Sequence, residues 1–68
     1  MKDSISLSQR SLDTLRVGTR VQSFSSSHGG EIAMVDIPSD VIWIRWEPNG
    51  AMLPHYRQKL TDVFDIDN

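Results

Sequence analysis

Short runs of alternating apolar and polar residues, separated by clusters of Gly, Pro, Ser and Asp, make up the chain from Val17 onward. Alternation with a period of two is typical of strands that bury one face, and the clusters are typical of turns. The pattern predicts five short strands, over residues 19–24, 31–37, 41–46, 51–57 and 61–66. We therefore expect an all-β domain of antiparallel strands joined by short connections.

The stretch "VIWIRWEPNG", residues 41 to 50, has the clearest alternation. A period of two divides its strand residues between two faces, with Ile42, Ile44 and Trp46 on one and Val41, Trp43 and Arg45 on the other. The first set is the natural core face. We therefore expect one indole to point into the domain and the other to point out of it.

The connections carry their own signals. In "EPNG", Pro48 fixes φ and Asn49-Gly50 tolerates positive φ, so residues 47–50 are expected to form the turn of a hairpin. Pro38 is expected to end the strand before it, because proline cannot donate to a ladder. The segment "RQKL", residues 57–60, is expected to form one 3₁₀ turn that delivers Leu60 to the core.

Other core positions are less sharply defined by the pattern. In the strand over residues 31–37, either Met34 or Val35 can face inward, and the alternation of Val21 with Phe24 is imperfect. The chain has two tryptophans, two phenylalanines and one tyrosine. We expect the core to need Trp46 and at least one of the phenylalanines, because aromatic side chains supply large buried areas.

The first 14 residues are rich in Ser, Asp and Gln, and their apolar residues are irregularly spaced. Ser8 is a suitable cap for a short helix through Gln9 to Leu15. A flexible or loosely docked N-terminal arm over residues 1–14 fits the composition better. The expected division is thus an arm over 1–14 and a single barrel domain over 15–68.

Composition narrows the class of protein. The chain has 68 residues, no cysteine and a formal net charge of −2, which disfavours a disulfide-stapled secreted scaffold and a phosphate-binding surface. No apolar run approaches the roughly 20 residues that span a bilayer, and no signal-peptide stretch is evident. We therefore expect a cytoplasmic protein with no membrane contact.

The order of these features resembles that of a known class. "VGTRV", "GGEIAMV", "VIWIRWEPNG" and "HYRQKLTDVF" follow one another as the elements of SH3-like small barrels of the Tudor and KOW kinds do, over about residues 15 to 66. The segment "IRWEPNG" followed by "HYR" is also similar to a hairpin of Mib/HERC-type barrels. The resemblance implies an SH3-like barrel and an interaction module rather than an enzyme.

Trp43 and Arg45 carry the main functional expectation. An outward indole beside a guanidinium on a rigid strand combines two residue types that are enriched at binding hot spots. Tyr56 and Arg57 are expected near the same face, so all four are candidate contacts for a protein or peptide partner. Two alternatives remain open: Trp43 covers the open side of the barrel by packing on Leu12, Leu15 or the arm, or the face forms a homodimer.

A second hypothesis is a small nucleic-acid-associated regulator. It requires five arginines to gather on one surface despite the acidic total: Arg10, Arg16, Arg20, Arg45 and Arg57. Catalysis and cofactors are not expected. The serine triplet 25–27 beside His28 lacks the elbow and the orienting acid of a nucleophile, and His28 and His55 lack a metal-ligand spacing.

Overall fold

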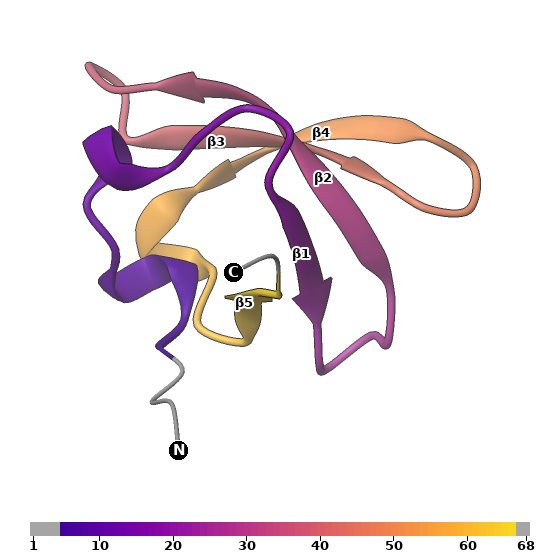
Figure 1. Cartoon of the computed structure of the whole chain (residues 1–68). Helices are drawn as coiled ribbons and strands as arrows, with labels where there is room; N and C mark the ends of the chain where they lie inside the picture. The colour runs from indigo at the N-terminus through magenta and orange to yellow at the C-terminus, as the bar shows by residue number, and fades with distance from the viewer. Residues whose placement is uncertain (1–4, 67–68) are drawn as a thin grey trace.

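Five antiparallel strands in one sheet form the framework of the molecule (Figure 1). The computed structural model describes residues 5–66. The strands are β1 (Arg20–Ser23), β2 (Gly29–Asp36), β3 (Val41–Trp46), β4 (Ala51–Tyr56) and β5 (Val63–Asp65). The three short 3₁₀ helices are η1 (Leu7–Gln9), η2 (Leu12–Thr14) and η3 (Arg57–Lys59). The predicted all-β class with five strands is confirmed.

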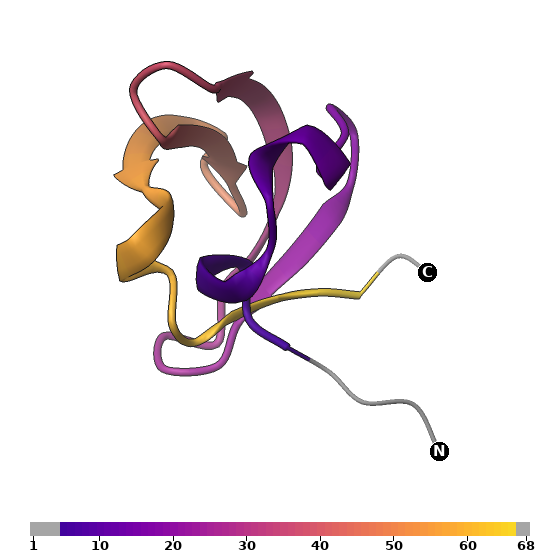
Figure 2. The same ribbon diagram turned by 90° about the vertical axis from the view of Figure 1, so that its left-hand side faces the viewer.

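The strand order across the sheet is β4-β3-β2-β1-β5. Consecutive strands from β1 to β4 are therefore neighbours. The chain then crosses from β4 to the opposite edge of the sheet, where β5 pairs with β1. η3 lies at the start of the connection from β4 to β5, and the sheet curls around this connection (Figures 1 and 2). β4 and β5 are thus the two edges of the sheet.

The turns and connections follow the sequence signals closely. Trp46 pairs with Ala51 across the predicted four-residue turn, where Gly50 has a φ of 76° and the Asn49 Oδ1 accepts a 3.0 Å hydrogen bond from the Ala51 amide. The predicted 3₁₀ turn is present as η3, and Leu60 directly after it is buried. Both predictions are confirmed.

An irregularity in β2 decides which of its apolar residues enter the core. Ile32 pairs with Ile44, but Met34 pairs with Trp43, so Ala33 is an extra residue on the β2 side. Such a bulge reverses the alternation beyond it. Val35 therefore packs against the core while Met34 is 47% exposed, which settles the choice that the sequence left open.

The core consists of aliphatic side chains from every strand except β4, together with the segments before β1 and after η3. Its buried members are Leu7, Leu12, Leu15, Val21, Ile32, Ile42, Ile44, Leu60 and Val63, with Val35 and Trp46 packed against them. No residue in this cluster is a phenylalanine. The aromatic ring that packs against it is that of Trp46.

The expectation of a buried phenylalanine is therefore wrong. Ser23, not Phe24, follows Val21 on the inner face, and Phe24 is 62% exposed beyond the end of β1. Phe24 instead stacks on the half-buried Phe64, with ring centroids 5.0 Å apart and an interplanar angle of 21°. The two rings cover each other on the outer side of β1 and β5, because Gln22 and Phe64 are cross-strand partners there.

The described part of the N-terminal segment is packed into the domain. Leu7 is fully buried, and Ser6 forms an isolated bridge with Phe64 on β5. The Ser8 amide donates to the Leu60 carbonyl at 3.2 Å. Figure 2 shows this segment in indigo, crossing one end of the curled sheet. Over residues 5–14 the expected arm is thus part of the core, while residues 1–4 of that arm lie outside the described residues.

The suggested helix over Gln9 to Leu15 is replaced by η1 and η2, which are separated by extended residues. Leu7, Leu12 and Leu15 are buried, and this irregular spacing does not match the 3.6-residue period of an α-helix. Within residues 5–66, no helix is long and apolar enough to cross a membrane.

Candidate functional site

The two faces of β3 have different surroundings, and their burial follows the predicted alternation. Ile42 and Ile44 are fully buried on the inner face. On the outer face Trp43 is half-buried and Arg45 is exposed. Trp43 therefore lies on the outside of the sheet, while Leu12 and Leu15 belong to the core on the other side. The alternative in which Trp43 packs on those two leucines does not match this placement.

Apolar residues flank Trp43 on both neighbouring strands. Met34 on β2 and Pro54 on β4 are its direct cross-strand partners, and directly opposed residues share a face of the sheet. Met52 pairs with Arg45, and Tyr56 pairs with Val41. We call the resulting surface the outer patch, and its members are Met34, Val41, Trp43, Met52, Pro54 and Tyr56.

The outer patch is substantially accessible to solvent. Met34 and Met52 are each 47% exposed and Tyr56 is 56% exposed. The apolar residues of the outer patch come from three neighbouring strands and lie on one face of the sheet. Exposed apolar areas are typical of interaction surfaces. Trp43 lies at the middle of the patch because the register places partners on both sides of it.

Charged side chains limit the patch on the β2 side and at one end. Arg45 is opposite Glu31, and Val41 is opposite Asp36. Arg45 is exposed, and none of the ion pairs found among residues 5–66 involves it. Its guanidinium is therefore available to donate to a carboxylate or carbonyl of a partner.

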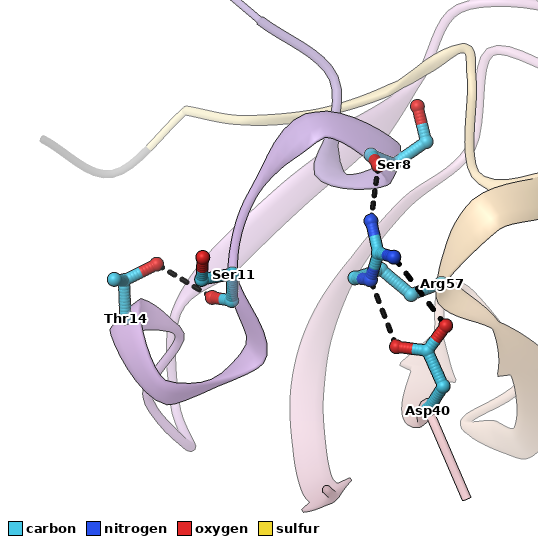
Figure 3. Close-up of polar contacts among 5 residues, drawn as sticks. All are labelled: Ser8, Ser11, Thr14, Asp40 and Arg57. Atoms are coloured by element: carbon cyan, nitrogen blue, oxygen red, sulfur yellow. Dashed lines mark hydrogen bonds and ion pairs between the residues drawn. The ribbon is translucent and has the colours of Figure 1, made fainter.

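Arg57 makes an ion pair and hydrogen bonds inside the domain. Its Nε donates to Asp40 Oδ1 at 2.8 Å, its Nη2 donates to Asp40 Oδ2 at 3.4 Å, and its Nη1 donates to the Ser8 carbonyl (Figure 3). Arg57 thus joins η3, the β2–β3 turn and the N-terminal segment. Three of its five N–H donors are therefore used inside the domain, and its expected contact with a partner stays a prediction.

The arginines of the nucleic-acid hypothesis are divided among separate ion pairs. Arg10 binds Asp65 and Arg20 binds Glu47, each at 3.3 Å, and Arg57 binds Asp40. Of the five, only Arg16 and Arg45 have no ion pair within the described residues. The structure therefore gathers no free basic cluster from these five side chains, and phosphate binding would require breaking the existing pairs.

A groove of about 500 Å³ lies on the other side of the sheet, against the inner face of β4. Trp46, Leu53 and His55 line one wall, and residues of the β1–β2 loop and of the η3–β5 connection line the other. Leu53 lines this groove and is 47% exposed. The groove is large enough for a small ligand or a peptide side chain.

The inward tryptophan has a specific polar partner in this groove. Trp46 Nε1 donates to His55 Nε2 at 3.0 Å, and the rings meet edge to face with centroids 5.7 Å apart at 85°. Burial lowers the pKa of His55 below its ordinary value of 6.5. The groove therefore presents an oriented indole and a neutral imidazole.

The serines beside the groove are hydrogen-bonded to one another and to Asp62. Ser23 is buried and its hydroxyl accepts from the Ser26 hydroxyl at 3.0 Å, while the Ser25 amide donates to Asp62 at 3.2 Å. The Ser25 hydrogen bonds lower the pKa of Asp62. Neither His28 nor His55 bonds to one of these serines among residues 5–66.

Some site residues were missed by reading the sequence. Counting outward from the turn at residues 47–50 pairs Trp43 with Pro54 and Arg45 with Met52, so these two patch members were within reach of the sequence. Met34 was not, because the bulge at Ala33 is needed to bring it beside Trp43. The Trp46–His55 contact also required the structure.

Comparisons with known proteins gave no relatives: no family model, no curated protein and no solved structure matches the chain. Among the described residues there is no group of three or more His, Asp or Glu side chains placed to hold a metal ion. The functional assignment therefore depends on the chain's own geometry.

Proposed function

We propose that this chain is an SH3-like barrel acting as a non-enzymatic interaction module that binds a protein or peptide partner through the outer patch and Arg45. The order β4-β3-β2-β1-β5, with a 3₁₀ helix between β4 and β5, supports the fold assignment. A cytoplasmic location is part of the same proposal, supported by the lack of cysteine in the chain.

The observation that carries the proposal is the row Met34, Trp43 and Pro54. These residues come from three adjacent strands and share one face of the sheet. A central tryptophan surrounded by methionine and proline can anchor a partner, since the rigid strands hold it in place and the flanking residues exclude water. Arg45 adds a directional donor at one end of the row.

Replacing Trp43 with Ala tests the proposal. We expect capture of the partner from a lysate of the source cells to fall by about tenfold or more, because loss of a hot-spot tryptophan typically costs 2 kcal/mol or more of binding free energy, about 30-fold in affinity. Thermal unfolding is measured on the same samples, and a modest shift in Tm is expected because Trp43 lies outside the core cluster.

The matched control is Val17→Ala. Val17 is 67% exposed and lies before β1, outside the patch, so its removal should leave capture unchanged. Size-exclusion chromatography of the wild type distinguishes a foreign partner from a second copy of the chain. A large loss of stability in Trp43→Ala with unchanged capture would contradict the proposal and make Trp43 a purely structural residue.

A further inference from the structure

The Trp46–His55 pair connects the two ends of β4 along the wall of the groove. Trp46 is opposite Ala51 at the turn end of the hairpin, whereas His55 is opposite Ile42 at the end next to η3. The two side chains that make the 3.0 Å hydrogen bond therefore reach toward each other over the inner face of β4. Leu53 lines the same groove. β4 is paired with β3 by its backbone and contributes no residue to the core cluster, so this contact is a side-chain link added to the backbone pairing.

The hydrogen bond requires one protonation state of the imidazole. An indole N–H can only donate, so His55 Nε2 must accept and the proton of the neutral ring must be on Nδ1. An imidazolium has two donors and no acceptor. Protonation of His55 therefore places two donors against each other and ends the bond.

We propose that the Trp46–His55 hydrogen bond is a proton-operated latch that fixes the inward indole against His55 in the groove at neutral pH and releases the indole on acidification. The latch is separate from the outer patch, because Trp46 and Trp43 lie on opposite faces of β3. It consists of one titrating side chain and one donor, both in contact with the groove.

Charged and titratable groups of both signs line the groove around His55. They are Glu47 in the β3–β4 turn, Lys59 in η3, Asp62 in the η3–β5 connection and His28 before β2. Glu47 is bound to Arg20 and Asp62 is hydrogen-bonded to Ser25. The two carboxylates favour the protonated form of His55, whereas the Lys59 ammonium opposes it.

The direction of the pH effect follows from the lowered pKa. Between the folded pKa of His55 and the ordinary value of 6.5, the unfolded chain binds more protons than the folded chain. Folding stability contributed by His55 therefore falls as the pH decreases through this window. Below the folded pKa no further loss arises from this residue, because both states are protonated.

Nuclear magnetic resonance of the two indole N–H groups tests the latch directly. The Trp46 indole signal should shift with the same midpoint as the His55 imidazole, below pH 6.5, while the Trp43 indole serves as the internal reference. On acidification, exchange of the Trp46 indole proton relative to that of Trp43 should rise about five- to tenfold, the range expected from losing one ordinary hydrogen bond.

Two variants separate the latch from a purely structural contact. His55→Gln retains an acceptor that does not titrate. The Trp46 signal should therefore become independent of pH between about 5 and 7.5, a range that brackets the ordinary histidine pKa of about 6.5. His28→Gln removes the other groove histidine and should leave the transition in place. A Trp46 signal that is unaffected while His55 titrates, or a transition that persists in His55→Gln, would overturn the proposal.

Discussion

The close approach of neighbouring strands limits which side chains fit at some positions of this chain, and Gly30 is the clearest case. It lies on the inner face of β2 and pairs with Val21 on one side and Trp46 on the other. A Cβ at this position would lie 2.8 Å from the Arg45 carbonyl and 3.0 Å from side-chain atoms of Ile44 and Trp46. Glycine is required here because there is no room for a Cβ. The backbone conformation does not require it, since the φ of Gly30 is not in the left-handed region.

Replacing Gly30 with Ala should therefore lower the free energy of unfolding by about 1–3 kcal/mol, the usual range for overpacking a well-packed site. The backbone carbonyl cannot move away as a flexible side chain would. Gly29→Ala is the matched control, since its Cβ would meet atoms at 3.5 Å and beyond, and a change within about 0.5 kcal/mol is expected. Urea denaturation measures both, and equal effects of the two variants would contradict the steric explanation.

Arg57 and Arg45 show that residue type alone does not assign a role. Arg57 is held by Asp40 and the Ser8 carbonyl (Figure 3). Arg45, in contrast, is exposed on the outer face of the sheet. A guanidinium has five donors in a fixed plane. Whether a partner can use them is decided by which acceptors the fold brings near.

At the scale of elements, the two edges of the sheet differ in what prevents them from pairing with a further strand. Ser6 bridges to Phe64 on the outer side of β5, so the N-terminal segment covers that edge. Among residues 5–66 no segment pairs with the outer edge of β4, and this strand carries Pro54 near its centre. Proline lacks the N–H that a further strand would bind, and it is tolerated where backbone groups point away from the neighbouring strand. Pro54 therefore protects the open edge.

Replacing Pro54 with Thr should restore a donor to the β4 edge and promote self-association. Sedimentation velocity over a concentration series is expected to show a larger associated fraction for this variant than for the wild type. Pro38→Thr, which makes the same substitution in the β2–β3 turn, is the control and should remain at the wild-type level. Identical sedimentation of all three proteins would mean that β4 is not protected by its proline.

At the scale of the whole molecule, the N-terminal segment completes a core that the sheet alone leaves open. A domain of this length has a total stability of about 3–10 kcal/mol, and it has no disulfide to add to this. The fully buried Leu7 and the buried Leu12 and Leu15 belong to the same cluster as the inner faces of β2 and β3. The segment before β1 is therefore part of the folding unit.

Leu7→Ala should lower the free energy of unfolding by about 2–5 kcal/mol, a large share of the total. The adjacent Ile5 is 44% exposed, so Ile5→Ala is expected to cost much less. Thermal unfolding followed by circular dichroism compares the two variants. Similar melting temperatures for both would indicate that the segment is only loosely docked, as the sequence had suggested.

The sequence by itself determined the class, the strands and the turns of this protein. Period-two alternation in residues 41–46, the Asn49-Gly50 turn and the polar connector before Leu60 are local signals, and local backbone preferences were enough to place them. They also placed Trp43 and Arg45 on the outer face, and the hairpin count that links Pro54 to Trp43 needs only the turn.

Only the tertiary structure decided which distant residues meet. The bulge at Ala33 depends on how β2 fits β3, the burial of Leu7 depends on a space that the curled sheet leaves open, and Arg57 finds Asp40 across 17 residues of chain. The Trp46–His55 bond depends on the hairpin's twist. Such contacts arise from packing between elements, and a pattern read along one chain carries no information about the distance between them.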